Sequence, residues 1–121
     1  MALFEDIEDK FHVLEDGRYL VRIDGFCREK TKNNTRPIRW ELSLMNEVKG
    51  TLPTKFSHIE TDGGFRILMD ELKRLGYTKP KSPDELEALL NELKGCFIEI
   101  GLFTTDRMEG YREVRFIRKV I

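Results

Sequence analysis

The stretch EDGRYLVRIDGFCRE, residues 15–29, decides the fold that the sequence predicts. Its side chains alternate, with Tyr19, Val21 and Ile23 on one face and charged residues on the other, as in a half-buried β-strand entered through an Asp-Gly turn. Gly25 interrupts the alternation and predicts a bulge or a sharp bend. A long strand bent at a glycine is what a strand shared by both halves of a small barrel requires.

A second alternating run, IRWELSLM, follows at residues 38–45. Its aliphatic residues and Trp40 share the inward face, and Arg39 lies on the outward face. Trp40, the only tryptophan, is therefore expected in the core rather than on a binding surface. The loop EKTKNNTRP separates this strand from the first one.

TLPTKFSHIE, residues 51–60, predicts a third strand with a proline near its start. Phe56 and His58 share one face of this strand, whereas Lys55 and Ile59 share the other. Both faces carry one apolar and one polar residue, so alternation leaves the orientation of the strand open.

The hydrophobic period then changes to that of helices. TDGGFRILMDELKRLGY has apolar residues three and four apart, and Thr61 or Asp62 can cap its start. In KPKSPDELEALLNELKG, Ser82 is a helix cap followed by proline and by the glutamate of a capping box. We therefore predict a helical insertion at about residues 62–94.

Two more strands, CFIEIGLFT and YREVRFIRKVI, follow the insertion. Three strands, a helical segment and a closing hairpin form the element order of the five-stranded Greek-key barrel called the OB-fold. We predict a mainly β protein, a single OB-fold domain over residues 1–121 with two helices between strands three and four. An α+β sheet with helices on one face is the alternative.

Length and composition exclude several classes of protein. The chain has 121 residues, 40% hydrophobic and 36% charged, which is typical of one soluble domain. No apolar run approaches the roughly 20 residues of a membrane span, and the acidic first ten residues do not resemble a signal peptide. Cys27 and Cys96 are too few for a disulfide framework, so we expect both to be reduced in a cytoplasmic protein.

The net charge of −1 hides an uneven distribution of charge. Residues 1–16 contain six acids and one lysine, whereas residues 28–39 contain five basic residues and one acid. Residues 107–119 contain five basic residues and two acids. Separation of this kind is typical of a surface that binds nucleic acid or another anion, although ordinary solvated surface is the alternative.

Several motifs resemble those of a widespread family of small bacteriophage proteins. They are the DGRY entry to the first strand, the KTK loop, the KG turn after IRWELSLMNEV, and LKG before the fourth strand. The family is described as binding single-stranded DNA through an OB-fold, and the resemblance covers the chain from about residue 11. It implies an OB barrel, single-stranded DNA as ligand, and a bacterial host cytoplasm. Phage single-strand binders often end in an acidic tail that recruits a replication or recombination protein as a partner. This chain departs from that pattern and ends in RFIRKVI, which argues against such a tail-mediated contact.

A groove for a single strand needs cations along the phosphates and exposed aromatic faces on which bases stack. OB-folds supply it on strands two and three, between the first hairpin loop and the loop joining strands four and five. The two basic segments coincide with these loops. We predict as nucleic-acid contacts the cations Lys30, Lys32, Arg36, Arg39, Lys55, Arg107 and Arg112, with Phe56, His58 and Tyr111 as aromatic contacts.

Other chemistries have weaker support. The two cysteines and two histidines lack the short spacing of a zinc site, so we expect no metal and no cofactor. His58, Glu60 and Asp62 suggest a metal-dependent nuclease, but no second acidic cluster completes a two-metal site. We therefore predict a non-enzymatic binder of single-stranded DNA, with RNA and a homo-oligomeric state left open. A protein-interaction module of phage replication or recombination is the alternative.

Overall fold

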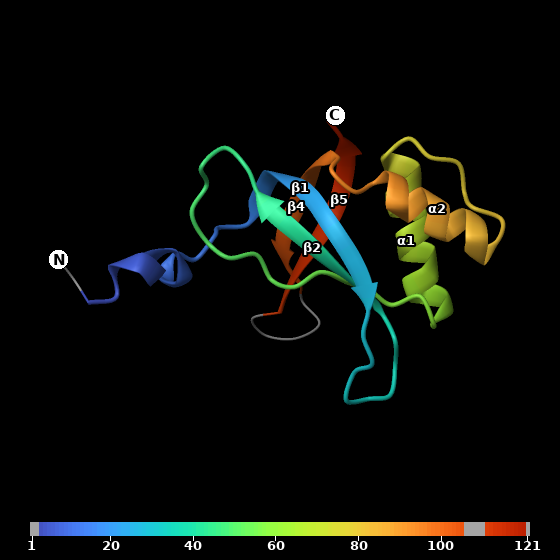
Figure 1. Ribbon diagram of the computed structural model, residues 1–121, viewed down its shortest axis with the longest axis horizontal. Helices are drawn as coiled ribbons and strands as arrows, with labels where there is room; N and C mark the ends of the chain where they lie inside the picture. Colours follow the sequence, from blue (N-terminus) through green and yellow to red (C-terminus); the bar gives the residue numbers. More distant parts are fainter. Residues whose placement is uncertain (1–2, 106–110, 121) are drawn as a thin grey trace.

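The computed structural model describes residues 3–105 and 111–120, apart from the side chains of residues 9 and 10. An antiparallel sheet has the order β3-β2-β1-β4-β5 and consists of β1 (Gly17–Arg28), β2 (Ile38–Leu44), β3 (Phe56–Ser57), β4 (Phe97–Thr104) and β5 (Arg112–Lys119). The helices α1 (Asp62–Arg74) and α2 (Pro83–Glu92) lie between β3 and β4 in the chain, and a 3-10 helix, Glu5–Phe11, precedes β1. The sheet curls into a half-barrel with both helices at one end (Figure 1). The predicted mainly β class and the helical insertion are confirmed.

β1 contains the bulge that its glycine predicted. The register with β2 shifts between Ile23 and Gly25, so the backbone of Asp24 is left out of the pairing with β2, although Ser43 Oγ donates to its carboxylate. Phe26 then pairs with Trp40, which brings it to the inner face of the sheet. A Cβ on Gly25 would lie 3.2 Å from the carboxylate of its cross-strand partner, a tight contact that favours glycine. The bend lets β1 pair with β4 along its first half and with β2 along its second.

Both helices begin at the caps that the sequence indicates. Thr61 Oγ1 accepts a hydrogen bond from Gly64 N, and Ser82 Oγ accepts one from Glu85 N. The carboxylate of Glu85 accepts from the backbone of Lys81, one residue earlier than in a standard capping box. These side chains satisfy helix N–H groups that have no partner within the helix, and they fix where each helix starts.

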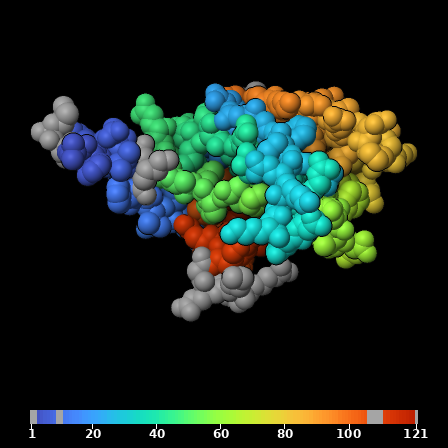
Figure 2. Space-filling view, turned by 60° about the horizontal axis from the view of Figure 1, so that its bottom comes forward, coloured from blue at the N-terminus to red at the C-terminus, as the bar shows by residue number. Residues whose placement is uncertain are grey.

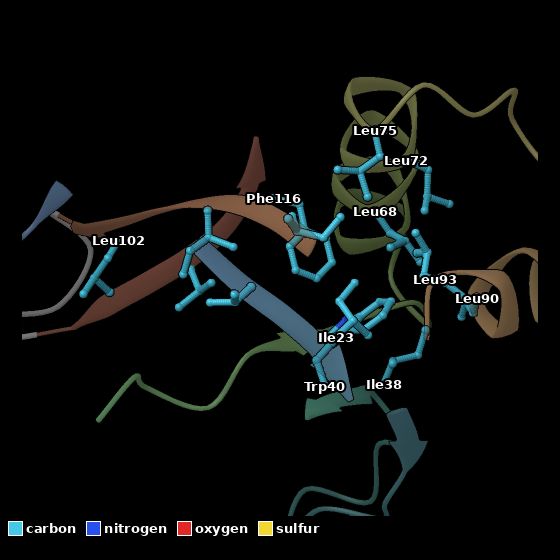
Figure 3. Packing of buried hydrophobic residues seen from close by; sticks show 14 of the residues in the cluster. Ile23, Ile38, Trp40, Leu68, Leu72, Leu75, Leu90, Leu93, Leu102 and Phe116 are labelled. Atoms are coloured by element: carbon cyan, nitrogen blue, oxygen red, sulfur yellow. The ribbon is translucent and has the colours of Figure 1, made fainter. Parts of the chain in front are cut away.

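The core lies between the sheet and the helices (Figure 3). Trp40 is 4% exposed, its ring lies 5.0 Å from that of Phe116 in an edge-on arrangement, and its Nε1 donates to Ser57 Oγ. The prediction that Trp40 faces the core is confirmed. The helices contribute the buried leucines Leu68, Leu72, Leu75, Leu90 and Leu93.

The third strand is shorter than predicted. Only Phe56–Ser57 form a ladder with β2, although residues 51–60 alternate. Pro53 has no N–H to donate, and residues 51–55 form a loop rather than a strand. In the part of the chain that the structure describes, no helix has the length and apolar character to cross a membrane.

Candidate nucleic-acid interface

The loop between β1 and β2 has internal hydrogen bonds that define its shape. The hydroxyls of Thr31 and Thr35 lie 2.7 Å apart, and Thr31 N donates to Thr35 O. Asn34 takes a left-handed conformation (φ 65°) at the tip, which asparagine tolerates better than most residues. This turn directs the side chains of Lys30 and Lys32 into solvent.

The loop is also tied to the segment that follows β3. Arg36 N donates to the Glu60 carboxylate, and Arg28 Nε donates to the carbonyl oxygen of Arg36 at 2.8 Å. Arg28 in addition lies 3.9 Å from Glu60. The basic loop and the end of the β3 segment therefore form one continuous surface, visible as neighbouring cyan and green regions in Figure 2.

The five basic residues between residues 28 and 39 differ in whether an acidic side chain neutralises their charge. Arg39 lies 3.1 Å from Glu29, and Arg28 has the longer contact to Glu60. Within the described ranges, no carboxylate lies within ion-pair distance of the exposed side chains of Lys30, Lys32 and Arg36. These three are the cations of the loop most available to an anion.

Two predicted aromatic residues lie beside this loop. Phe56 on β3 pairs directly with Arg39 on β2, and directly paired residues of antiparallel strands project from the same face. The ring of His58 lies 6.1 Å from that of Phe56 at an angle of 33°, and both rings are exposed. The structure therefore brings a guanidinium and two ring faces together on the outer face, and it settles the orientation of β3.

A groove of about 630 Å³ continues from these rings toward β5. Phe56 and His58 line one side, and Tyr111 lines the other together with the first residues of β5. The N-terminal end of α1, including Gly64, forms part of its wall. Tyr111 is 46% exposed, so its ring is available to a ligand that enters the groove.

Lys55 does not belong to the exposed surface, contrary to the sequence prediction. It is 5% exposed, and its Nζ donates at 2.8 Å to both the Glu71 carboxylate and the Val114 carbonyl. Burial lowers the pKa of Lys55, and the carboxylate of Glu71 opposes that shift. Because Phe56 points outward, its neighbour Lys55 points inward, and its ammonium is already bonded to Glu71 and Val114.

Arg112 is held in an intramolecular contact. Its guanidinium donates to the Asp16 carboxylate and to the carbonyl oxygen of Leu14, which fastens the entry of β1 to the start of β5. The ion pair lowers the pKa of Asp16, and hydrogen bonds from Thr104 lower it further. Arg112 is therefore a weaker candidate for phosphate contact than the sequence suggested. Arg107, also predicted, lies outside the described residues.

Three further aromatic residues on β1 and β4 differ in their exposure. Phe26 and Phe97 are half-buried, and Phe26 packs on the core beside Trp40. Phe103 is exposed on β4 and does not line the groove, although its cross-strand partner Glu113 does. Phe56 and His58 are both exposed, a point that alternation in the sequence left open.

The described residues form no metal-binding site and no disulfide. No group of three or more His, Cys, Asp or Glu side chains there could hold a metal ion. Cys27 and Cys96 are free thiols, each half-buried. Glu60, one of three residues that suggested a nuclease, instead accepts from Arg36 N.

The sequence prediction missed three residues that contribute to the surface. Thr31 and Thr35 shape the loop, and Glu60 joins it to β3. The threonine spacing of four residues across the asparagine pair was the available signal, because such hydroxyls commonly close turns.

Comparisons with known proteins assign no family to this chain. A scan against protein-family models finds no match, and a search of curated proteins finds none with significant similarity.

Proposed function

We propose that the protein binds single-stranded DNA without catalysis. The phosphate backbone would run along the exposed cations Lys30, Lys32 and Arg36, and bases would stack on Phe56 and His58. Sequence-tolerant recognition of single strands combines these two elements, cations for the backbone and π-faces for the bases.

The observation that carries the proposal is the pairing of Arg39 with Phe56. It sets the basic β1–β2 loop and the exposed rings of β3 on one continuous face. Because Arg39 is paired with Glu29, the phosphate contacts would come from Lys30, Lys32 and Arg36, and the Arg39 guanidinium would lie beside a base stacked on Phe56. Tyr111 at the far side of the groove extends the aromatic surface.

We also propose that the half-barrel is of the OB type. β1 is the shared strand that pairs with both β2 and β4, and the helical insertion lies between β3 and β4. OB-folds bind oligonucleotides across strands two and three. The motifs that resemble bacteriophage single-strand binders agree with this proposal and suggest a role in phage replication or recombination.

The test is fluorescence anisotropy with labelled single-stranded DNA, single-stranded RNA and duplex DNA across a salt series. We expect single-stranded DNA to bind more tightly than duplex, with log K falling against log salt by about 0.7 for each phosphate contact. Failure to bind single strands even at low salt would refute the proposal. Equal affinity for duplex DNA would indicate a binding site other than this groove. Tighter binding of RNA would indicate that RNA, rather than DNA, is the ligand.

A protein-interaction module is the second candidate. It is favoured by a separate apolar groove beside the helices, which is lined by Phe65 and Leu86. Binding of a partner in that groove would depend on salt less steeply than binding of DNA, because burial of apolar surface releases no counterions and an electrostatic contribution would come mainly from Lys79 and Lys81.

A further inference from the structure

The segment before β1 exposes large apolar side chains. Four of them, all between residues 3 and 13, are between 65% and 84% exposed: Leu3, Phe4, Phe11 and Val13. Single exposed apolar residues are common, but a cluster of this kind marks a surface that another molecule covers.

The same segment is acidic. Residues 3–13 contain four acids and one lysine, and Glu5, Asp6 and Glu8 fall in the first turn of the 3-10 helix. The segment leaves the body of the protein at Leu14, which is 6% exposed and anchored in the core. In Figure 1 it extends to the left, at the opposite end of the molecule from α1 and α2.

A groove with the complementary character lies beside the helices. It has a volume of about 770 Å³ and is lined by the apolar side chains of Ile59, Phe65 and Leu86. Arg28, Lys79 and Lys81 also line it, and the lining residues include no carboxylate. The guanidinium of Arg28 lies 3.9 Å from the Glu60 carboxylate, which offsets its charge. The two lysines are therefore the principal positive charges of the groove.

The groove is built on fixed backbone. Pro80 and Pro83 flank the Ser82 cap of α2, and Lys81 N is bonded to the Glu85 carboxylate. Proline restricts the backbone dihedral angles, so little conformational entropy would be lost when a ligand enters.

We propose that residues 3–13 of one copy of the chain dock in the Phe65–Leu86 groove of a second copy. The apolar side chains of the segment cover those of the groove, and its acids face Lys79 and Lys81. The segment lies at the opposite end of the molecule from α1 and α2, whose residues line the groove (Figure 1), so the contact forms between copies. Each copy then offers one free segment and one free groove, and such a heterologous contact repeats into short chains of molecules. This association is independent of the proposed DNA binding.

Two pairs of substitutions test the contact without disturbing the fold. Phe4→Ser with Phe11→Ser removes the apolar anchors of the segment, and Lys79→Glu with Lys81→Glu reverses the charge of the groove. All four side chains are exposed, so both variants should unfold at nearly the wild-type temperature. Val48→Ser with Val120→Ser and Lys49→Glu with Lys73→Glu are the matched controls at exposed sites outside the contact.

The measurement is molar mass by sedimentation or light scattering over roughly 1 µM to 1 mM, the range of weak transient interfaces. The mass of the wild-type protein and of both controls should rise with concentration, whereas each test variant should keep the mass of one chain. An equimolar mixture of the two test variants should form a dimer that grows no further, because one retains the groove and the other the segment.

Three results would overturn the proposal. The first is a wild-type protein that stays monomeric over the whole range. The second is self-association that neither test variant reduces. The third is a mixture of the two variants that fails to form the dimer. None of these results depends on whether the protein binds DNA.

Discussion

Lys55 and Glu71 form a buried ion pair, with Nζ and Oε2 2.8 Å apart and both side chains less than 5% exposed. Lys55 also donates to the Val114 carbonyl, and Glu71 accepts from Phe116 N, so both side chains bond to the backbone of β5. In the described ranges no ladder joins β3 to β5, the two outer strands of the sheet. The pair therefore holds the half-barrel together along the seam where strand pairing is missing.

The first prediction concerns this pair. Lys55→Met should lower the free energy of unfolding by about 3–5 kcal/mol, because it leaves the Glu71 carboxylate buried without its partner. Adding Glu71→Gln should recover much of that loss, since the amide oxygen can still accept from Phe116 N without a charge. Urea denaturation of both variants measures the effect, with the exposed Lys49→Met as control at within about 0.5 kcal/mol of wild type. Equal stability of the single and double variants would contradict the coupling.

The second prediction concerns pH. Hydrogen bonds from Arg112 and Thr104 lower the pKa of Asp16 below its ordinary value of 3.8. A lowered carboxyl pKa contributes stability above that ordinary value, and the contribution is lost as the pH falls through the pKa of the folded state. Asp16→Asn should therefore destabilise the protein at neutral pH and flatten the fall in stability below about pH 4.

Chemical denaturation at a series of pH values measures this slope. The exposed Glu87→Gln on α2 is the control and should leave the acid slope as in wild type. If Asp16→Asn and wild type lose stability in parallel below pH 4, the contact with Arg112 does not contribute as described.

The third prediction compares neighbouring glycines of α1. A Cβ on Gly64 would lie 1.8 Å from the His58 carbonyl oxygen, whereas a Cβ on Gly63 would meet nothing within 4 Å. Gly64→Ala should force the end of the β3 segment away from α1 and lower the melting temperature. Gly63→Ala should be neutral or stabilise by about 0.5–1 kcal/mol, because alanine loses less backbone entropy in a helix. Similar melting temperatures for the two variants would show that α1 does not approach His58 so closely.

The fourth prediction tests the basic loop. Replacing Lys30, Lys32 and Arg36 together by alanine should weaken binding of single-stranded DNA and reduce the slope of log K against log salt by about 2. The fold should be unaffected, because all three side chains are exposed. A control with the same change of charge, Lys49, Lys73 and Arg74 to alanine, should change affinity much less. If both triple variants lose equal affinity, the effect comes from net charge and not from the loop.

The fifth prediction tests stacking. Phe56→Ala should weaken single-strand binding by about 1–3 kcal/mol, since a base loses its platform, while the salt slope stays constant. Phe103→Ala is the matched control, because Phe103 is 38% exposed and Phe56 is 39% exposed, but Phe103 lies outside the groove. Anisotropy titrations measure the affinity of both variants for single-stranded DNA. Equal affinities would show that Phe56 is not part of the interface.

Local patterns in the sequence determined much of the fold. The alternation around Val21 and Ile23, the bulge at Gly25 and the caps at Thr61 and Ser82 all follow from interactions within a few residues. The inward position of Trp40 follows from alternation in the same way. The sequence also identified the loop that carries Lys30 and Lys32 on the surface, because its charges and turn residues are contiguous.

Only the tertiary structure decided the roles of Lys55 and Arg112. A lysine or arginine in a strand ordinarily faces solvent, and neither residue has a local partner that predicts otherwise. Lys55 is buried because Glu71 on α1 and Val114 on β5 converge on it, and Arg112 is held by Asp16 from the opposite end of the chain. Periodicity within a strand indicates which face of the sheet a side chain lies on. The oppositely charged partner on that face comes from an element far away in the sequence, and only folding brings the two together.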